Sequence, residues 1–435
     1  MRAQSLKKAL ASALGAALAP AADFLARREK DPAAFWQACL FASFWISVAF
    51  FPIGYGFREV SPLVCALFLV GYYRHGWRES ALRNLRVWPL FLFGLAMIII
   101  GVVFSIRPLD SLLVAGTGLN KGYLLPFVAM ECAKSRRQIC RLVWAFVLAC
   151  FWEGLDGVWQ ICVGQDFVMG YAPNAGRLTG SLGDYTVGNY LALALIPAFA
   201  VWLQLREREG YPAALLIFIA LFWPAFALLC GASSRSSILA VAGAVFLWQA
   251  LSRGLFSIRA YLYPALVMGA FAVCQPGRLA VSAALGDNRW DLWRLAWRVF
   301  ERHPFFGAGA GQYNAAFREM GLAPEREVIT ISHPHSLYLD MLYAHGAAGF
   351  ACGMIFVGGF LIWGAAKIFP RLRAPKNEAG RLYWATVAWF WLGYAGWLIN
   401  GIFGHDFYRI WWLAEAMCSL GITIGAIELG LKEDY

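Results

Sequence analysis

The stretch HPHSLYLDMLYAHGAAGF, residues 333–350, joins a long polar segment to a strongly apolar one. The polar segment begins at Gly277, and the region 277–350 concentrates basic and titratable side chains. It contains four of the six histidines, His303, His333, His335 and His345, and the arginines Arg289, Arg294, Arg298 and Arg302. Apolar blocks flank the region on both sides, so we expect the rest of the chain to hold it at a membrane surface.

The composition of the chain indicates its class. Hydrophobic residues fill 60% of the 435 positions and charged residues 14%, with a mean hydropathy of +0.57. Soluble globular proteins do not reach these values. Because a spanning helix needs about 20 apolar residues, the sequence predicts an all-α polytopic membrane protein with about twelve transmembrane helices. We expect the spans at 34–56, 60–73, 88–104, 110–130, 142–163, 187–204, 212–230, 237–251, 260–276, 337–366, 382–404 and 410–430.

The distribution of basic residues predicts the orientation of these spans. If the N-terminus is cytoplasmic, most of the 37 Lys and Arg residues lie on the inner side, and the C-terminus is cytoplasmic too. The short loops on the outer side then hold Arg58, Arg107, Arg177, Arg235 and Arg409. Membrane insertion therefore explains most of the net charge of +11, and no nucleic-acid partner is expected.

The N-terminus and the cysteines suggest neither export nor disulfide bonds. The run ALASALGAALAPAA is weakly apolar, and Arg27, Arg28 and Lys30 follow it, so we expect a cytoplasmic amphipathic helix and not a signal peptide. The ten cysteines form no CxxC pair, which indicates neither a disulfide framework nor a zinc site.

Lys121 is a charged residue within a predicted span, where it needs a partner or a wet cavity. Glu153 and Asp156 in the next span are three residues apart and therefore share one helix face. The two readings, a structural ion pair and a role in substrate binding, are equally open.

Two outer loops each carry one arginine among small residues. Arg177 lies in a Gly-rich loop, 164–192, whose glycines let a ligand approach the backbone closely. Arg235 lies in CGASSRSSILA, 230–240, where a turn that opens a helix presents N–H groups and the positive end of the helix dipole. A guanidinium adds donors that suit phosphate oxygens. The alternatives are a merely solvated Arg177 and an Arg235 that reaches the membrane interface.

The segment DNRWDLWRLAWRVFERHPFFG, 287–307, predicts an amphipathic helix in the large outer loop. Asp287 or Asn288 can cap its start, and Pro304 and Gly307 end it. Arginines alternate with tryptophans at helical spacing, which is typical of a helix lying in the headgroup region. The following GAGAGQY has no preceding strand, so it is not a dinucleotide-binding motif.

His333 and His335 flank Pro334 immediately before the tenth predicted span. No acidic or Cys set completes a metal site around them, so no metal is expected. A neutral imidazole near the outer surface can accept a proton at neutral pH. The segment GHDFYR, 404–409, adds His405, Asp406 and Arg409 at the same surface.

The three arginines Arg177, Arg235 and Arg289 can together neutralise a departing diphosphate while His335 takes a proton from an attacking hydroxyl. The chain has no DxD motif, so arginines replace the divalent cation in this reading. Transfer of a sugar chain from a lipid diphosphate is chemically coherent with this set. An exporter or flippase of lipid-linked saccharide would use a similar lining, but would bury its charges near mid-membrane.

Four segments resemble, in order and spacing, successive motifs of the O-antigen ligase and polymerase superfamily. They are RLTGSLGDYTVGNYLA, SSRSSILA, NRWDLWRLAWRVFERHPFFGAGAGQY and HPHSLYLDMLYAHGAAG, which cover roughly residues 174–350. The last two together are fairly specific. The resemblance implies a metal- and cofactor-independent glycosyltransferase that joins undecaprenyl-diphosphate-linked O-antigen to a sugar of lipid A-core. It implies a Gram-negative inner membrane and a periplasmic active site.

The resemblance also implies roles for individual residues. The essential histidine of the family falls on His335, and its two arginines fall on Arg235 and Arg289. Ser336 stands where many members have Asn, and His333 is an additional candidate for the base. We expect substrate-binding roles for Arg177, Arg294, His333, Tyr338 and Arg409, and inversion at the anomeric carbon.

Ligase and polymerase remain alternatives within the superfamily, and the single dominant outer loop favours the ligase. The short chain after Leu431 disfavours transfer to protein. The expected organisation has four parts: a cytoplasmic amphipathic N-terminus (1–33), transmembrane helices one to nine (34–276), a large periplasmic loop with amphipathic helices (277–336), and helices ten to twelve with a short cytoplasmic tail (337–435).

Overall fold

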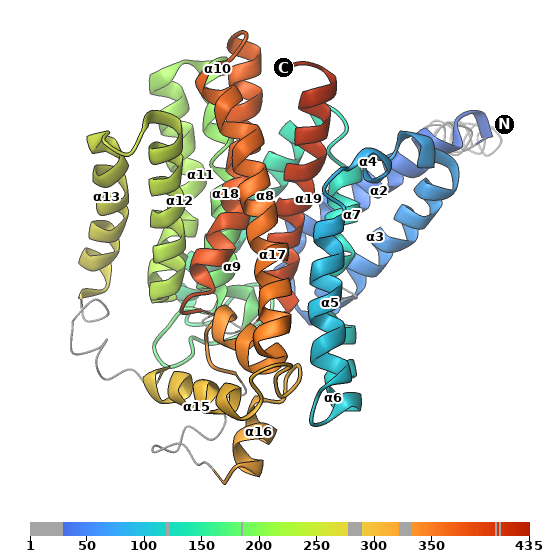
Figure 1. The fold of residues 1–435 in the computed structure, drawn as a ribbon. Coiled ribbons are helices and arrows are strands. Elements are labelled where there is room, and N and C mark those ends of the chain that lie inside the picture. Colours follow the sequence, from blue (N-terminus) through green and yellow to red (C-terminus); the bar gives the residue numbers. More distant parts are fainter. Residues whose placement is uncertain are drawn as a thin grey trace, which may run out of the picture.

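The computed structural model of the chain describes residues 29–118, 122–183, 186–276, 289–321, 333–404, 407–408 and 410–435. Most of the expected N-terminal amphipathic helix, residues 1–28, lies outside these ranges. Within them the chain is helical, and the one β-bridge joins Asn174 to Arg177. Long helices lie side by side in a bundle, with the C-terminus at one end and α15 at the other (Figure 1).

The first half of the bundle ends at the bend that follows α9. Its helices are α2 (Pro32–Phe50), α3 (Tyr55–Gly76), η1 (Trp77–Glu79), α4 (Ala81–Asn84), α5 (Pro89–Val103), α6 (Pro108–Gly118), α7 (Leu125–Glu131), α8 (Arg136–Val163), η3 (Gly180–Leu182) and α9 (Val187–Ala198). The second half contains α10 (Val201–Glu209), α11 (Tyr211–Gly231), α12 (Arg235–Arg253), α13 (Ile258–Cys274), α15 (Arg289–Arg302), α16 (Tyr313–Glu319), α17 (Leu337–Arg373), α18 (Glu378–Asn400) and α19 (Ile410–Lys432).

The all-α polytopic class predicted from composition is confirmed. Each predicted span coincides with a helix or with a pair of helices. In the described residues, six helices are long and apolar enough to cross a membrane, or seven if α9 and α10 form one bent span. The helices α5 and α13 are apolar but shorter, so the predicted number of about twelve spans stays a prediction.

Two predicted spans are broken helices. The span expected at 110–130 consists of α6 and α7, and Pro126 in the first turn of α7 suits the start of a new helix. The span expected at 187–204 consists of α9 and α10, which meet at an angle of 42°. Pro197 lies just before this bend and cannot donate the backbone hydrogen bond that a straight helix needs.

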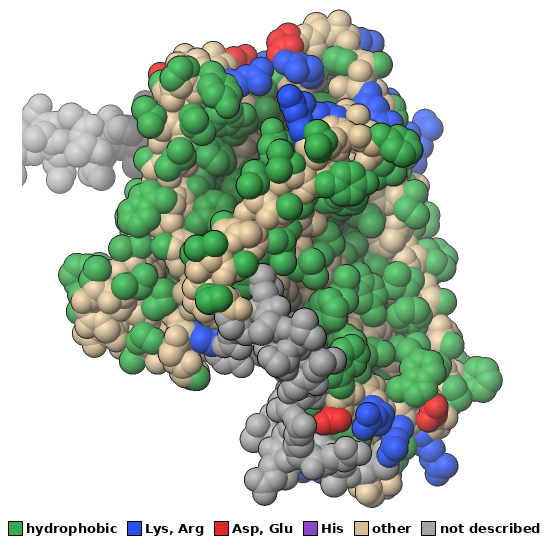
Figure 2. Space-filling view, turned by 90° about the vertical axis from the view of Figure 1, so that its left-hand side faces the viewer, with side chains coloured by type: hydrophobic (Ala, Val, Ile, Leu, Met, Phe, Trp, Pro, Cys, Tyr) green, Lys and Arg blue, Asp and Glu red, His purple; other side chains and the backbone are tan. Residues whose placement is uncertain are grey.

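The core of the bundle is built around α9, α18 and α19. Every residue of α9 is buried, and 89% of the apolar window of α19 is buried. Peripheral helices such as α3, α11 and α13 expose large hydrophobic side chains instead. A broad hydrophobic band separates charged side chains at the two ends of the molecule (Figure 2). This distribution is expected of a bundle whose apolar sides face lipid and whose ends face water.

The helix α15 lies across the end of the bundle, not parallel to it (Figure 1). Its buried face consists of Leu292, Leu295, Ala296 and Val299. Trp290, Arg294, Trp297 and Arg298 lie on its exposed face. The predicted amphipathic helix of the outer loop is therefore present, and it packs on α17.

Candidate functional site

The helix α17 is broken close to its start, and this break shapes the candidate site. Gly346 has φ 61° and ψ −171°, so the helical hydrogen-bond pattern stops there. A broken helix exposes backbone groups that need other partners. Here the segment 304–309 supplies them through four hydrogen bonds: Ala308 N to Tyr343 O (2.8 Å), Gly309 N to Ala344 O (2.9 Å), Ala347 N to Pro304 O (2.8 Å) and Ala348 N to Phe305 O (3.1 Å).

Two glycines allow this close contact between backbones. A Cβ atom at Gly307 would lie 2.4 Å from the carbonyl carbon of Ala344, and one at Gly346 would lie 2.4 Å from the carbonyl carbon of Phe305. Both glycines also have positive φ, 78° and 61°. The Gly-rich run that follows α15 is therefore a structural clasp. It holds the segment of α17 before the break, 337–345, against the outer loop.

The clasp also contacts α5 and the short connection after it. Ala310 N donates to Gly101 O at 3.0 Å, and Ile106 N donates to Ala308 O at 3.0 Å. His303, just before the clasp, is half-buried, and burial together with the adjacent Arg302 lowers the pKa of this histidine. Both effects favour the neutral form of His303.

His335 lies immediately before α17 in a left-handed backbone conformation with φ 53°. This region is uncommon for residues other than glycine, although histidine enters it more often than most. The His335 N–H donates to Nδ1 of His333 at 3.2 Å, and the two ring centroids are 4.2 Å apart. His333 is 4% exposed, whereas His335 is half-buried. The ring of His333 thus accepts a backbone N–H and fixes the turn that carries His335.

The helix α15 contacts the same turn. Trp293 donates from its indole nitrogen Nε1 to the carbonyl of Pro334 at 3.0 Å, and its ring stacks on Phe403 with centroids 5.6 Å apart. Arg289 is the first residue of α15, one helical turn before Trp293. Arg289 therefore lies one turn from Trp293, and His335 directly follows Pro334, the two partners of this hydrogen bond.

Arg235 is the first residue of α12, and a polar network lies beside it. The amide oxygen Oδ1 of Asn189 accepts hydrogen bonds from the hydroxyls of Ser234 (3.2 Å), Ser236 (3.2 Å) and Ser237 (2.7 Å). The amide of Asn400, at the end of α18, donates to the same oxygen at 3.2 Å. The Ser234 side chain consequently does not cap α12.

This network connects the start of α12 to the start of α17. Gly401 follows Asn400, and its carbonyl accepts a hydrogen bond from Leu337 N at 2.7 Å. Leu337 is the first residue of α17 and lies two positions after His335. The structure therefore links the segments that carry Arg235, Arg289 and His335 through a short series of hydrogen bonds.

Arg177 lies at the same end of the molecule. Its Nε donates to the carbonyl of Ala232 at 2.7 Å, three residues before Arg235. The next residue, Leu178, donates its N–H to Gly231 O at 3.1 Å. The Arg177 loop is thus fastened to the turn between α11 and α12.

Polar side chains of α8 hold this loop from the other side. Glu153 accepts from the Ser181 hydroxyl at 2.6 Å, and Asp156 accepts from Phe167 N at 2.6 Å. Gln160 donates to the Thr179 hydroxyl at 2.9 Å. Both carboxylates thus accept hydrogen bonds from the loop, and the two readings of Glu153 and Asp156, an ion pair and substrate binding, stay open. Lys121, their expected partner, lies outside the described residues.

The remaining predicted binding residues have different surroundings. Arg294 forms an ion pair with Asp291 at 3.6 Å on the exposed face of α15. The Tyr338 hydroxyl donates to the carbonyl of Leu398 at 3.0 Å, which ties α17 to α18. Arg409, with His405 and Asp406, lies outside the described residues. Among the described residues, no three His, Cys, Asp or Glu side chains lie together as metal ligands would.

Sequence motifs do not reveal three features of the site. The clasp at 304–309 forms its hydrogen bonds with α17, and the Gly-rich sequence does not name that partner. Asn189 and Asn400 are 211 positions apart and have no shared motif. Trp293 looked like one more aromatic residue of an interfacial helix. The only usable signal was an amide residue inside an otherwise apolar helix, as at Asn189 and Asn400.

A comparison with models of protein families finds a match within the chain. Residues 182–354 match the model of a protein family described as O-antigen ligase, and no curated protein matches the chain. The matched region contains Arg235, Arg289, His333 and His335, together with the clasp and the break in α17. This match supports the resemblance to the O-antigen ligase/polymerase superfamily over the matched region.

Proposed function

We propose that the protein is an O-antigen ligase: a glycosyltransferase that moves O-antigen polysaccharide from undecaprenyl diphosphate to a sugar hydroxyl of lipid A-core. The site would lie at the periplasmic face of the inner membrane. The observation that carries the proposal is the series of hydrogen bonds that links α12, α15 and α17 near their starts, each of which lies within the region that matches the family. Each of these starts carries one residue of the expected chemistry.

In the proposed reaction, the acceptor hydroxyl oxygen attacks the anomeric carbon of the donor sugar. The bond between this carbon and the diphosphate oxygen breaks, and undecaprenyl diphosphate leaves. His335 accepts the proton of the hydroxyl, and its position outside α17 suits a group that approaches from the aqueous side. A single displacement of this kind inverts the anomeric configuration.

Arg235 and Arg289 would balance the negative charge that develops on the departing diphosphate. Arg235 lies at the positive end of the α12 dipole, and the Ser234 side chain does not cap that helix. Guanidinium groups bind phosphate oxygens through paired donors, whereas an ammonium binds as a point charge. Arg177, fastened beside the same turn, would extend this cationic surface.

The deciding experiment supplies the purified protein with lipid-linked O-antigen and two acceptors, lipid A-core and a lipid-linked repeat unit. A ligase extends lipid A-core, whereas a polymerase lengthens the lipid-linked chain. A protein that translocates the lipid in vesicles without extending either acceptor would be an exporter. The ligase proposal also expects full activity in chelator, and a strict requirement for Mg²⁺ would contradict it.

Arg289→Lys tests the role of the paired donors. We expect a loss of transfer of roughly a hundredfold, because an ammonium cannot reproduce the guanidinium fork at a developing diphosphate. The matched control is Arg298→Lys, on the exposed face of the same helix, which should transfer normally. Full activity of Arg289→Lys would remove this residue from diphosphate recognition.

A further inference from the structure

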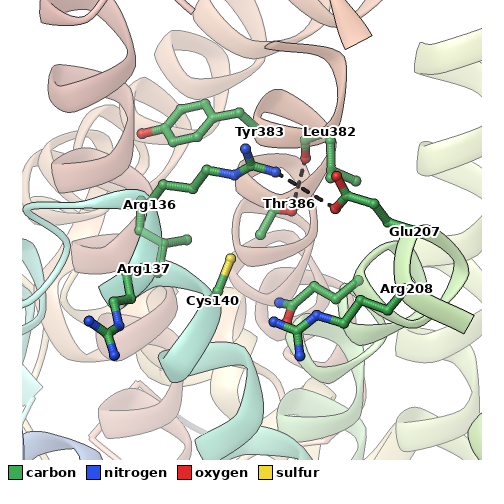
Figure 3. A pocket seen from close by; sticks show the side chains of 10 residues that line it. Arg136, Arg137, Cys140, Glu207, Arg208, Leu382, Tyr383 and Thr386 are labelled. Atoms are coloured by element: carbon green, nitrogen blue, oxygen red, sulfur yellow. Dashed lines mark hydrogen bonds and ion pairs between the residues drawn. The ribbon is translucent and has the colours of Figure 1, made fainter. Parts of the chain in front are cut away.

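A cavity of about 390 Å³ opens at the end of the bundle opposite α15, between α8, α10 and α18 (Figure 3). This volume lies in the range of ligand pockets. The cavity is lined by the start of α8, by the second and third turns of α18 and by the C-terminal half of α10. It therefore lies where the bundle changes from apolar to charged side chains, far from the helix starts of the proposed site.

The cavity has a surplus of positive charge. Arg136 and Arg137 of α8 and Arg208 of α10 line it, and Glu207 is the single carboxylate among the lining residues. Arg136 reaches across the cavity toward Glu207. Arg208 lies to the right of Cys140 in this view (Figure 3). The pair between Arg136 and Glu207 is 3.7 Å long, and both side chains are exposed, so it is weak. One carboxylate leaves two of the three positive charges uncompensated.

Gln204 provides an independent indication of a ligand. It lines the cavity, and its residue is 7% exposed. Its Oε1 accepts from the indole N–H of Trp144 at 3.1 Å, and because an indole nitrogen only donates, the amide orientation is fixed. The amide nitrogen Nε2 then has no acceptor among the described residues. A buried donor without a partner is costly, and a ligand oxygen would relieve that cost.

The deeper lining of the cavity is apolar. Ile139 lies one turn into α8 and is 1% exposed, and Leu382 lies one turn into α18. A ligand that fits this lining has an anionic head for the arginines and Gln204, and an apolar part for the walls. A basic pocket between transmembrane helices at the membrane surface is the kind of site that binds lipid headgroups.

We propose that this cavity binds the headgroup phosphate of an anionic phospholipid. Phosphate oxygens would accept hydrogen bonds from Arg136, Arg208 and the Gln204 amide, and the acyl chains would lie along the exposed side of α8. The lipid would join α10 to α8 and α18 and so stabilise the segment that follows the bend after α9. This inference does not depend on the reaction that the protein catalyses.

The test titrates the purified full-length protein in neutral detergent with dioctanoyl phosphatidylglycerol. Native mass spectrometry measures the bound lipid, and thermal unfolding measures the stabilisation. We expect saturable binding and a raised unfolding midpoint with this lipid, and neither with dioctanoyl phosphatidylcholine. Equal binding of phosphatidylcholine would overturn the proposal. Equal binding of glycerophosphoglycerol, the same headgroup without acyl chains, would show a soluble phosphate ligand instead.

Three variants separate the cavity from general surface charge. Arg136→Gln and Arg208→Gln should each weaken phosphatidylglycerol binding about fivefold, the effect of one arginine near a charged lipid. Gln204→Glu keeps an acceptor for Trp144 but opposes the phosphate with a carboxylate, and should abolish binding. The control is Arg253→Gln, an exposed arginine at the same end of the bundle, at the end of α12. Unchanged binding in all three cavity variants would refute the site.

Discussion

At the scale of single residues, the two neighbouring histidines have different environments. His335 lies in a left-handed conformation, which costs backbone free energy of about 1 kcal/mol or more for a residue with a Cβ. His333 offsets this cost in part, because its ring accepts the N–H of His335. A strained residue held by a buried neighbour is a frequent arrangement at functional sites. We therefore propose a positioning role for His333 and keep His335 as the proposed base.

This difference between the histidines predicts different effects of substitution. His335→Gln should lower the transfer rate by roughly a hundred- to ten-thousandfold, the contribution of a general base. His333→Asn should retain most of the rate, because the Asn Oδ1 can accept the same N–H as the histidine Nδ1 does. His333→Leu cannot, and should be slower than His333→Asn.

The measurement is the rate of transfer to lipid A-core as a function of pH. His333→Asn should keep the acidic limb of the wild-type pH profile, because the base is unchanged. If His333→Asn is as inactive as His335→Gln, the assignment of base and positioning residue is wrong.

At the scale of elements, the break in α17 is the most informative feature. A continuous helix through Gly346 would pair its own backbone groups and leave the segment 304–309 without partners. At the break, the backbone groups of α17 form hydrogen bonds with the clasp instead. The segment of α17 before the break, which directly follows the turn at His335, is consequently fixed to the outer loop as well as to the bundle.

Gly346→Ala should therefore be strongly destabilising. The added Cβ would meet the backbone of Phe305 at 2.4 Å, in addition to the cost of positive φ for a residue with a side chain. We expect a loss of about 3 kcal/mol or more in the free energy of unfolding, measured by thermal or chemical unfolding in detergent.

A matched control is Gly170→Ala, where φ is also positive, 75°, but no atom lies within 4 Å of the added Cβ. This control carries only the conformational cost, about 1–2 kcal/mol. Equal destabilisation of the two variants would show that the contact between Gly346 and the clasp contributes little.

At the scale of the whole molecule, the hydrophobic band and its charged ends determine how the bundle sits in a membrane (Figure 2). The end that carries α15 contains few basic residues outside that helix, and the end that carries the C-terminus contains many. Because Lys and Arg are biased toward the cytoplasm, we propose that α15 lies on the outer side. Both the proposed active site and the proposed lipid cavity depend on this orientation.

Cysteine labelling tests the orientation. Cys162 and Cys274 are exposed and end α8 and α13 on the α15 side, so a membrane-impermeant maleimide should label them from the periplasm. In a Cys162→Ser/Cys274→Ser background, Arg253→Cys should be labelled only after the inner membrane is permeabilised. Labelling of Arg253→Cys from the periplasm would reverse the topology.

The sequence by itself determined the class of the protein and the place of nearly every helix. Composition and apolar run length decide both, because lipid forces each spanning segment to pair its own backbone groups. It also indicated the amphipathic helix at 289–302, since the alternation of Trp and Arg has a helical period. The motif residues Arg235, Arg289 and His335 were selected from the sequence as well.

Only the tertiary structure decided how these segments meet. The bend after α9 and the break in α17 depend on which backbone groups find partners elsewhere, and local sequence does not specify those partners. The side-chain hydrogen bond between Asn189 and Asn400 joins two helices, α9 and α18, that are far apart in the chain. Apolar run length predicts that a helix crosses the membrane, but packing between helices decides which of its polar residues face one another.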